Sequence, residues 1–419
     1  MSAMDIDSTD ISTVLATIRS ELDSTNNSDE LVSLFYQLED YYERKLWHQL
    51  TQQLDEFYTQ YDQDQIPLEL KHKIYTQFIQ QFAMKLNLIK VVDFLILSKF
   101  NNETSLDKLI DLKTEYIAYL KREHNFKDNE DGSQDPEFVE LLSNDESLIY
   151  IDLQICRYYL FLNQFEKCDS IMSKIESKFE DLTNNDLSAK VNAAYYQTKC
   201  LEYKLHENYN AYYTNGLLFL SSVPSLTTED KVKLCYDLCI AALLGDKVYN
   251  FGELILHDIL QEIASDESPY NWLYNLIHAL NAGDLSSFNQ WLSVAFKKSP
   301  QLQSHQVFIK QKIIIMALLE LISTKSTTNK RISFKEISEF TGTPLNDVEH
   351  LIIKCFSLKL IQGYINQIDE ILVITWLQPR ILNLKQVHNL YTHLVDWDHK
   401  VEQLGNLVHQ SGGTVWAGI

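Results

Sequence analysis

The chain has 419 residues, of which only 11 are glycine and 7 are proline, and its formal net charge is −22. Glycine and proline make up roughly 12% of an average protein, so this chain can build few tight turns. This composition disfavours β-sandwiches, β-barrels and glycine-loop nucleotide folds. The negative charge disfavours a nucleic-acid binder, because neutralising phosphates requires clustered lysine and arginine.

The remaining composition predicts a soluble helical protein. Hydrophobic residues make up 45% and charged residues 22% of the chain, well outside the range of disordered segments. Residues 1–10 contain three aspartates and no basic residue, so we expect neither a secretory signal nor a transit peptide. No apolar run reaches the ~18 residues of a membrane span. The six scattered cysteines predict reduced thiols, and we expect a location in the cytoplasm and nucleus.

Helix follows helix from about residue 11 to residue 325. The i, i+3, i+4, i+7 spacing of a helix face recurs between short polar breaks, and its first instance is Leu31, Leu34, Phe35, Leu38 and Tyr42. This pattern predicts antiparallel helix pairs stacked as a TPR-like solenoid with degenerate repeats, over residues 1–122 and 148–325.

Several sites carry helix start signals. Three of them place a capping hydroxyl before a proline that suits the first helical position: Ser268–Pro269, Ser299–Pro300 and Thr343–Pro344. Thr227 with Asp230 resembles a capping box, with aspartate in place of the usual glutamate.

Residues 123–147 interrupt the helical pattern with nine acidic residues and one lysine, a net charge of −8. We predict that most of this insert is a solvated, partly flexible loop between two helical blocks. A docking site for a basic surface is the alternative.

The spacing of apolar residues along the sequence changes in residues 326–378. A short apolar strand at 332–334 is followed by predicted helices at 335–340 and 343–358, and then by two β-rich runs at 360–365 and 371–376. The five residues between these runs, 366–370, suit a hairpin. Strand, helix, helix, strand, strand is a winged-helix arrangement.

One long helix is predicted for residues 379–411, before a tail at 412–419. It carries apolar residues at consecutive a and d positions of three heptads: Val387, Leu390, Leu394, Trp397, Val401, Leu404 and Val408. A seam this short suits a multi-helix bundle better than a lone dimer, so we predict a protein interface here. The alternative is that the helix packs back on its own chain.

The sequence predicts no catalytic residue, no metal ligand and no cofactor. Phosphate-binding glycine loops and nucleophile-elbow motifs are missing, as is the H-E-x-x-H metal motif. Cys235 and Cys239 share a helix face but lack a second pair, so core packing is favoured. His388, His393 and His399 scatter around one helix, and the segment 127–132 has a lysine where a calcium loop needs its first carboxylate.

The winged helix raises the possibility of DNA recognition, which its charge disfavours. Residues 331–380 contain five basic and six acidic residues, a sum of −1, whereas a duplex binder has a basic stripe. A strand edge of the wing can instead add to the sheet of another protein. The candidate interface residues are Ile365, Asn366, Ile371, Val373 and Ile374.

Four segments resemble one protein family closely. They are 41–47 (YYERKLW), 241–254 (AALLGDKVYNFGEL), 346–351 (NDVEHL) and 376–381 (WLQPRI). In addition, Trp272 through the turn Gly283–Asp284 to Phe288 looks like the helical part of a PCI domain. The chain resembles PCI-domain subunits of the 26S proteasome regulatory-particle lid, in particular the family called regulatory particle non-ATPase subunit nine in yeasts and thirteen in animals. The resemblance spans nearly the whole chain and is weakest at 123–147.

The resemblance implies a mostly α fold and a structural, non-catalytic subunit of a hetero-oligomeric complex. Its implied partners are other lid PCI subunits, through side-by-side winged helices, and the lid helical bundle; no nucleic acid and no membrane are expected. The alternatives are a PCI scaffold of the signalosome or of a translation initiation factor, a winged-helix transcription regulator, and an enzyme with an unrecognised site.

Overall fold

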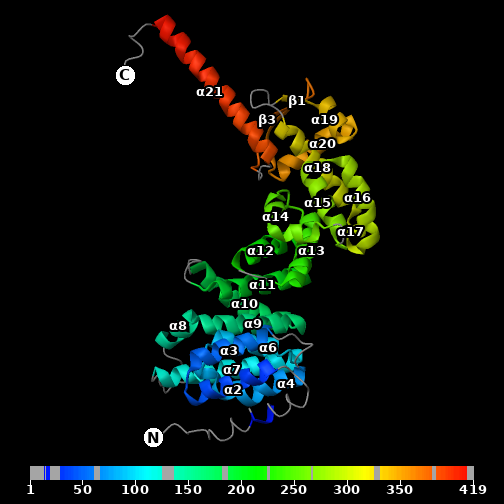
Figure 1. Cartoon of the computed structure of the whole chain (residues 1–419). Coiled ribbons are helices and arrows are strands. Elements are labelled where there is room, and N and C mark those ends of the chain that lie inside the picture. The colour runs from blue at the N-terminus through cyan, green and yellow to red at the C-terminus, as the bar shows by residue number, and fades with distance from the viewer. Residues whose placement is uncertain are drawn as a thin grey trace. The chain divides into compact units, whose positions relative to one another are not determined.

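The computed structural model describes residues 14, 16–18, 29–60, 67–124, 136–181, 187–223, 227–265, 268–324, 331–379 and 384–412. The chain forms two compact units (Figure 1). The first comprises Met1–His206 with Leu218–Pro224, and the second comprises Glu207–Leu217 with Ser225–Ile419. Helix α12 (Tyr209–Ser222) is divided between them.

The described part of the first unit consists of helices and short connections, with no strand, as the sequence predicts. Helices α2, α3, α4, α6 and α7 lie close together in Figure 1. Its elements are α2 (Asp29–Glu43), α3 (Trp47–Gln60), α4 (Leu68–Lys73), the π-helical turn η1 (Ile74–Ile79), α5 (Gln80–Phe82), the 3-10 turn η2 (Ala83–Lys85), α6 (Leu88–Leu97), α7 (Asn102–Glu123), α8 (Pro136–Asn144), α9 (Glu146–Phe161), α10 (Phe165–Asp181) and α11 (Ala189–Leu205).

Helix α9 is the centre of the first unit, because it packs on α6, α7, α8, α10 and α11. Its apolar residues are spread around the whole helix, which is typical of a helix buried on all sides. Ile151, Ile155 and Leu160 are all at most 3% exposed. Asp145 caps its first turn by accepting a hydrogen bond from the Ser147 amide at 2.8 Å.

A polar link joins three helices beside this core. The Asp93 carboxylate on α6 accepts a hydrogen bond from the Tyr150 hydroxyl on α9 at 2.6 Å, and it also pairs with the Lys190 ammonium on α11. Burial and the adjacent Asp93 charge raise the pKa of Tyr150, so its hydroxyl stays a donor at neutral pH. Asp93 therefore sets how α6, α9 and α11 meet.

The helical part of the second unit follows the same principle of short, capped helices. Its elements after α12 are α13 (Thr228–Leu244), α14 (Gly252–Leu256), the 3-10 segment η3 (Asp258–Ile263), α15 (Asn271–Ala282), α16 (Leu285–Lys298), α17 (Pro300–Ser304) and α18 (Gln306–Thr324). The Thr227 hydroxyl accepts a hydrogen bond from the Asp230 amide at 3.3 Å, so the predicted cap of α13 is confirmed.

A Gly-Asp turn lets α15 and α16 pack as an antiparallel pair. Gly283 has φ 66°, and an added Cβ would lie 3.0 Å from the Ala317 Cα on α18, so only glycine fits. Asp284 then caps α16 by accepting hydrogen bonds from the Ser286 and Ser287 amides at 3.0 and 3.4 Å. Hydrogen bonds from these two serines lower the pKa of Asp284 to about 2.

The side chain of Lys312 ties α18 to the end of α13. It is 1% exposed, and its ammonium donates to the carbonyl oxygens of Ala242 at 2.7 Å, Gly245 at 2.5 Å and Leu243 at 3.4 Å. The last carbonyls of a helix have no partner within the helix, so this cation supplies their missing donors at the negative pole of α13. Burial lowers the pKa of Lys312 to about 7, against the opposing attraction of Asp246.

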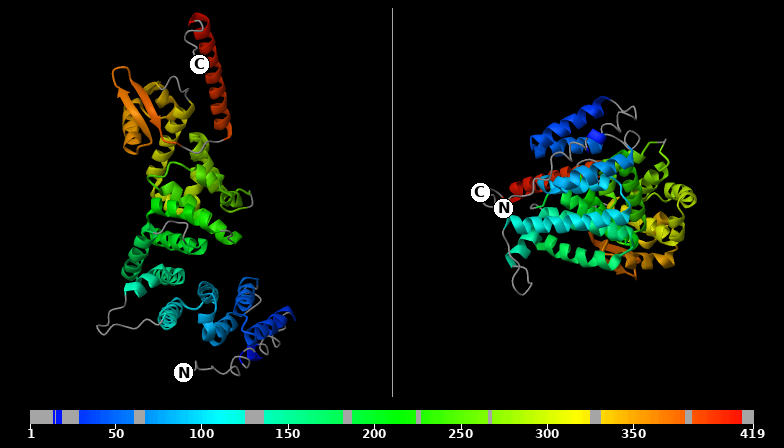
Figure 2. Two further views of the ribbon diagram at one scale, coloured as in Figure 1. Left: turned by 90° about the vertical axis from the view of Figure 1, so that its left-hand side faces the viewer. Right: turned by 90° about the horizontal axis from the view of Figure 1, so that it is seen from below.

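The winged helix contains a three-stranded sheet in the order β1-β3-β2. Its elements are β1 (Arg331–Ser333), α19 (Phe334–Thr341), α20 (Leu345–Ser357), β2 (Ile361–Asn366) and β3 (Ile371–Leu377). Both pairings are antiparallel, with Ile332 opposite Leu372 and Ile365 also opposite Leu372. The hairpin β2–β3 is orange in the left view of Figure 2. The predicted winged helix is confirmed, with element bounds shifted by one or two residues.

Part of the insert 123–147, which we predicted to be mostly loop, is helical: α7 extends to Glu123, α8 occupies Pro136–Asn144 and α9 begins at Glu146. Phe138 of α8 is 1% exposed and packs with Leu120 and Leu148, which stabilises this helix despite its acidic surroundings. Residues 125–135 of the insert, like the tail 413–419, lie outside the described residues.

Two predicted helix starts were wrong. Helix α15 begins at Asn271, after the turn that contains Ser268–Pro269. In α20, Pro344 precedes the first helical residue, Leu345. Of these three prolines, Pro300 alone occupies the first position of its helix, where its missing N–H costs nothing, and the Ser299 hydroxyl before it makes no capping hydrogen bond.

We expect replacement of Lys312 by methionine to lower the free energy of unfolding by about 2 kcal/mol or more at neutral pH, because buried carbonyls lose their donor. Between about pH 7 and 9 the unfolded state binds more protons at Lys312 than the folded state, since the folded pKa is about 7. The stability gap between wild type and variant should therefore widen by on the order of 1 kcal/mol per pH unit. Urea denaturation of both proteins at pH 7 and 8.5 measures this, and a pH-independent gap would contradict it.

Candidate protein-interaction surfaces

Helix α21 (Leu384–Gly412) carries the predicted seam on one uninterrupted helix of 29 residues. The structure confirms that the segment is helical from Leu384, and residues 380–383 before it lie outside the described residues. All seven seam residues are between 46% and 64% exposed: Val387, Leu390, Leu394, Trp397, Val401, Leu404 and Val408. Because helix α21 leaves these side chains open to solvent, the alternative that they are buried on their own chain is not what the structure shows.

Three further apolar residues widen this surface. Tyr391 is 63%, Val395 46% and Leu407 61% exposed. Tyr391 and Leu407 occupy heptad positions e and g, which border the a and d seam on its two sides, and Val395 occupies position b, next to e. The sequence analysis missed them because it followed only the a and d positions. An apolar face of this width fits contact with more than one neighbouring helix, which is the geometry of a bundle.

The five wing residues predicted as an interface have different environments. Ile374 is 4% exposed and lies inside the winged helix, so its assignment to a surface was wrong. Ile371 and Val373 belong to β3, the central strand, whose edge at these positions is paired on both sides. They cannot accept an added strand, although their half-buried side chains can contribute to a face.

The remaining two wing residues lie on β2. Ile365 is half-buried, and Asn366 is engaged in the hairpin turn, where its amide donates to the Asp369 carboxylate at 2.8 Å. Strand β2 is an edge strand of the described sheet. Of the wing elements named in the sequence analysis, this edge is therefore the part that can pair with another chain.

Two exposed apolar residues of the wing escaped the sequence analysis. Ile368, at the tip of the hairpin, is 95% exposed, and Tyr364 on β2 is 57% exposed. An isoleucine inside a four-residue hairpin turn is itself a signal, because such turns usually hold glycine, asparagine or aspartate.

Gly363 fixes the shape of this hairpin. The register shifts between Gln362 and Gly363, so one strand carries a bulge. A Cβ at Gly363 would lie 2.1 Å from the Val373 carbonyl oxygen, so no side chain fits at this close approach.

Other kinds of site are not found in the described residues. No group of three or more histidine, cysteine, aspartate or glutamate side chains is placed to hold a metal ion there. In the same ranges no helix has both the length and the apolarity to cross a bilayer. All six cysteines are buried free thiols, and the Cys235 and Cys239 sulfurs lie 3.9 Å apart within the core.

Helical repeats followed by a winged helix and a long exposed helix define a PCI-domain protein, and residues 289–376 match the family model of the PCI domain. Residues 34–277 match the model of PSD13 N-terminal repeats, and residues 380–412 match that of the Rpn9 C-terminal helix. The chain belongs to the Rpn9/PSD13 family. The predicted fold class and the family resemblance are both confirmed.

Curated relatives agree with this assignment. The chain is 34% identical over 413 residues to the 26S proteasome regulatory subunit RPN9 of Saccharomyces cerevisiae, covering 97% of this chain and 98% of the relative. It is 29% identical to the 26S proteasome non-ATPase regulatory subunit 13 homolog B of Arabidopsis thaliana, covering 91% and 94%. The corresponding subunit 13 of Dictyostelium discoideum is also 29% identical, with 88% and 91% covered.

We expect Gly363→Ala to lower the free energy of unfolding by about 1–3 kcal/mol, because the new methyl group forces β2 and β3 apart. Urea denaturation followed by circular dichroism measures the change. Gly405→Ala is the matched control, since a Cβ at Gly405 of α21 meets nothing within 4 Å. Equal stability of the two variants would contradict the close approach at Gly363.

Proposed function

We propose that this chain is a non-catalytic structural subunit of the 26S proteasome regulatory-particle lid, supporting lid assembly and thereby ubiquitin-dependent protein degradation. The observation that carries the proposal is the exposed apolar face of α21, on a chain similar over nearly its full length to proteasome regulatory subunits. The relatives called non-ATPase subunits support a structural role.

The energetics of α21 favour assembly. Burying a large apolar side chain contributes about 1.5–3 kcal/mol, and association costs several kcal/mol of lost freedom and ordering. Seven seam residues and three further apolar residues supply enough apolar surface to exceed that cost. Since α21 is already helical before it meets a partner, little backbone entropy remains to be lost.

The winged helix supplies the second contact in the proposal. Its partners are the winged helices of other lid PCI subunits, which can reach the free edge of β2 or the exposed Tyr364 and Ile368. The acidic residues Asp347 and Glu349 on α20, where a duplex reader has cations, support a protein partner rather than nucleic acid. We place the complex in the cytoplasm and nucleus, with no membrane partner.

A second candidate is a PCI scaffold of another complex. The chain is 21% identical to the eukaryotic translation initiation factor 3 subunit M of Aspergillus fumigatus, but this similarity covers only 46% of the chain. Affinity purification with mass spectrometry separates the two: proteasome subunits support the first candidate, and initiation-factor subunits support the second.

The variant Leu394→Asp, Trp397→Asp, Val401→Asp tests the role of α21. We expect incorporation into the lid to fall by more than about tenfold, because three charges enter the apolar face, while both units stay folded by circular dichroism. Co-sedimentation with the intact proteasome measures incorporation.

The matched control adds three acids to the opposite side of the same helix: Thr392→Asp, His399→Asp and Asn406→Asp, all at f positions. We expect this control to assemble normally. Normal incorporation of the seam variant, or equal loss in the two variants, would contradict the proposed role of the face.

A further inference from the structure

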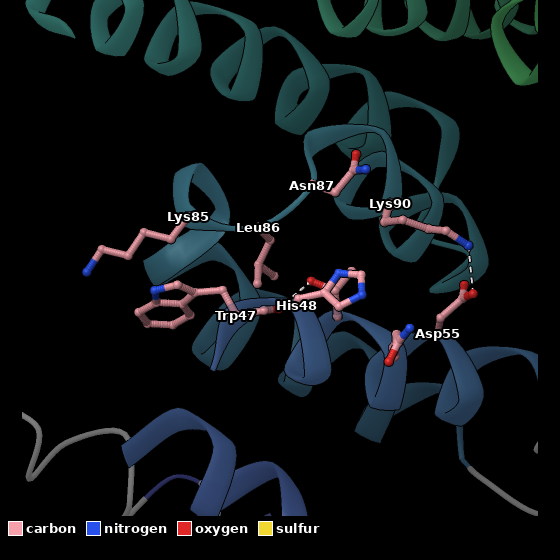
Figure 3. A pocket seen from close by; sticks show the side chains of 9 residues that line it. Trp47, His48, Asp55, Lys85, Leu86, Asn87 and Lys90 are labelled. Atoms are coloured by element: carbon pink, nitrogen blue, oxygen red, sulfur yellow. Dashed lines mark hydrogen bonds and ion pairs between the residues drawn. The ribbon is translucent and has the colours of Figure 1, made fainter. Parts of the chain in front are cut away.

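A hollow of about 540 Å³ opens in the first unit, far along the chain from α21 and the wing. Its walls come from α3, the end of η2 and the start of α6 (Figure 3). The volume lies within the range of pockets that hold small ligands or a few residues of a peptide.

The floor of this hollow is apolar and rigid. Leu86 is 8% exposed. The Trp47 indole packs against the rings of Tyr42 and Phe82, whose centroids lie 6.0 and 5.8 Å from its own. Because these aromatic neighbours fix the indole, a ligand side chain that packs on it pays little entropy for ordering the site.

Unengaged polar groups surround the floor. The Lys85 ammonium lies 5.1 Å from the centroid of the Trp47 ring and has no ion-pair partner among the described residues. The side chains of His48 and Gln52 are exposed and make no hydrogen bond within the described chain. Asn87 uses its carbonyl oxygen to accept from the Ile89 amide at 3.1 Å, which leaves its NH₂ group available.

The hollow is locally cationic in a chain of net charge −22. At the end opposite Lys85, the Lys90 ammonium is neutralised by the Asp55 carboxylate at 2.6 Å, as the dashed line in Figure 3 marks. Among the residues that the structure describes, Lys85 therefore remains without an opposing charge. In addition, neither α3 nor α6 carries an acidic side chain in its first turn, so the positive poles of both helices are also unopposed.

We propose that this hollow binds an acidic peptide segment of a partner protein. One carboxylate pairs with Lys85, the amide side chains of Gln52 and Asn87 bond to the peptide main chain, and a neighbouring apolar side chain packs on Trp47 and Leu86. Side-chain amides suit a peptide because they offer both donors and acceptors.

The same groups argue against a phosphate ligand. Phosphate sites gather several cations or free backbone amides around the anion, whereas here the second lysine is already paired and Asp55 repels a doubly charged group. A single carboxylate matches better the one lysine of the hollow that is unpaired among the described residues.

Peptide display on the full chain tests the proposal, with a random dodecamer library counter-selected on Lys85→Glu. We expect enriched peptides to combine aspartate or glutamate with an adjacent apolar residue. Calorimetry with one such synthetic peptide should give binding that weakens about tenfold in Lys85→Glu and in a peptide whose acids are replaced by amides, the loss of one partly desolvated ion pair.

Two variants sharpen the result. Lys174→Glu makes the same charge change on exposed α10, outside the hollow, and should leave binding unchanged. Asp55→Asn frees the Lys90 ammonium and should tighten binding several-fold, a gain that a misfolded variant cannot produce. No enrichment, non-acidic peptides, equal loss in Lys85→Glu and Lys174→Glu, or displacement of the peptide by an equal concentration of pyrophosphate would each overturn the proposal.

Discussion

A helix of 29 residues that leaves its apolar side chains about half-exposed is not explained by the folding of its own chain. In α21 the seven seam residues and three further apolar residues stay open to solvent, whereas α9 and α18 bury most of theirs. Exposed apolar faces of this kind mark interaction sites in water-soluble proteins. The function proposed for the chain follows from this surface. The other parts of the second unit position or stiffen α21, which bears it.

The second unit is stiffened by interactions that leave little freedom at its joints. Lys312 supplies donors to the last carbonyls of α13, Gly283 allows α15 and α16 to pack against α18, and Gly363 allows β2 to approach β3. Each replaces a flexible connection by a specific contact. A scaffold needs such joints, because it orders its partners only as well as its own elements are ordered.

The sequence predicts a large part of the fold because each element carries its own local period. Runs rich in β-branched residues mark β2 and β3, and the heptads mark α21. Elements that depend on distant contacts escape such patterns. Helix α8 is stabilised by packing of Phe138 on Leu120 and Leu148. The acidic composition of this segment gives no indication of that packing. The Lys312 cation is buried because it donates to carbonyls some 70 positions earlier in the chain. No local sequence pattern predicts such a contact.

The candidate surfaces also divide into those that a local pattern predicts and those that depend on how distant segments meet. All seven a and d residues of α21 are exposed as a seam requires, because helix periodicity alone decides which residues share a face. In the wing, the sheet order β1-β3-β2 decides which strand has a free edge. Ile374 is buried within β3 while Ile368 is exposed in the hairpin turn, and neither follows from strand propensity. The hollow beside Trp47 requires α3 and α6 to meet, so a pass along the sequence cannot find it.

Site-specific photo-crosslinking in the assembled complex tests the central claim most directly. A benzoylphenylalanine at Leu394, on the apolar face of α21, should crosslink to helices of other lid subunits, while the same probe at His399 on the opposite side should give few or no such products. Crosslinks from position 394 only to its own chain, or equal yields from both positions, would contradict the claim that partner helices cover this face.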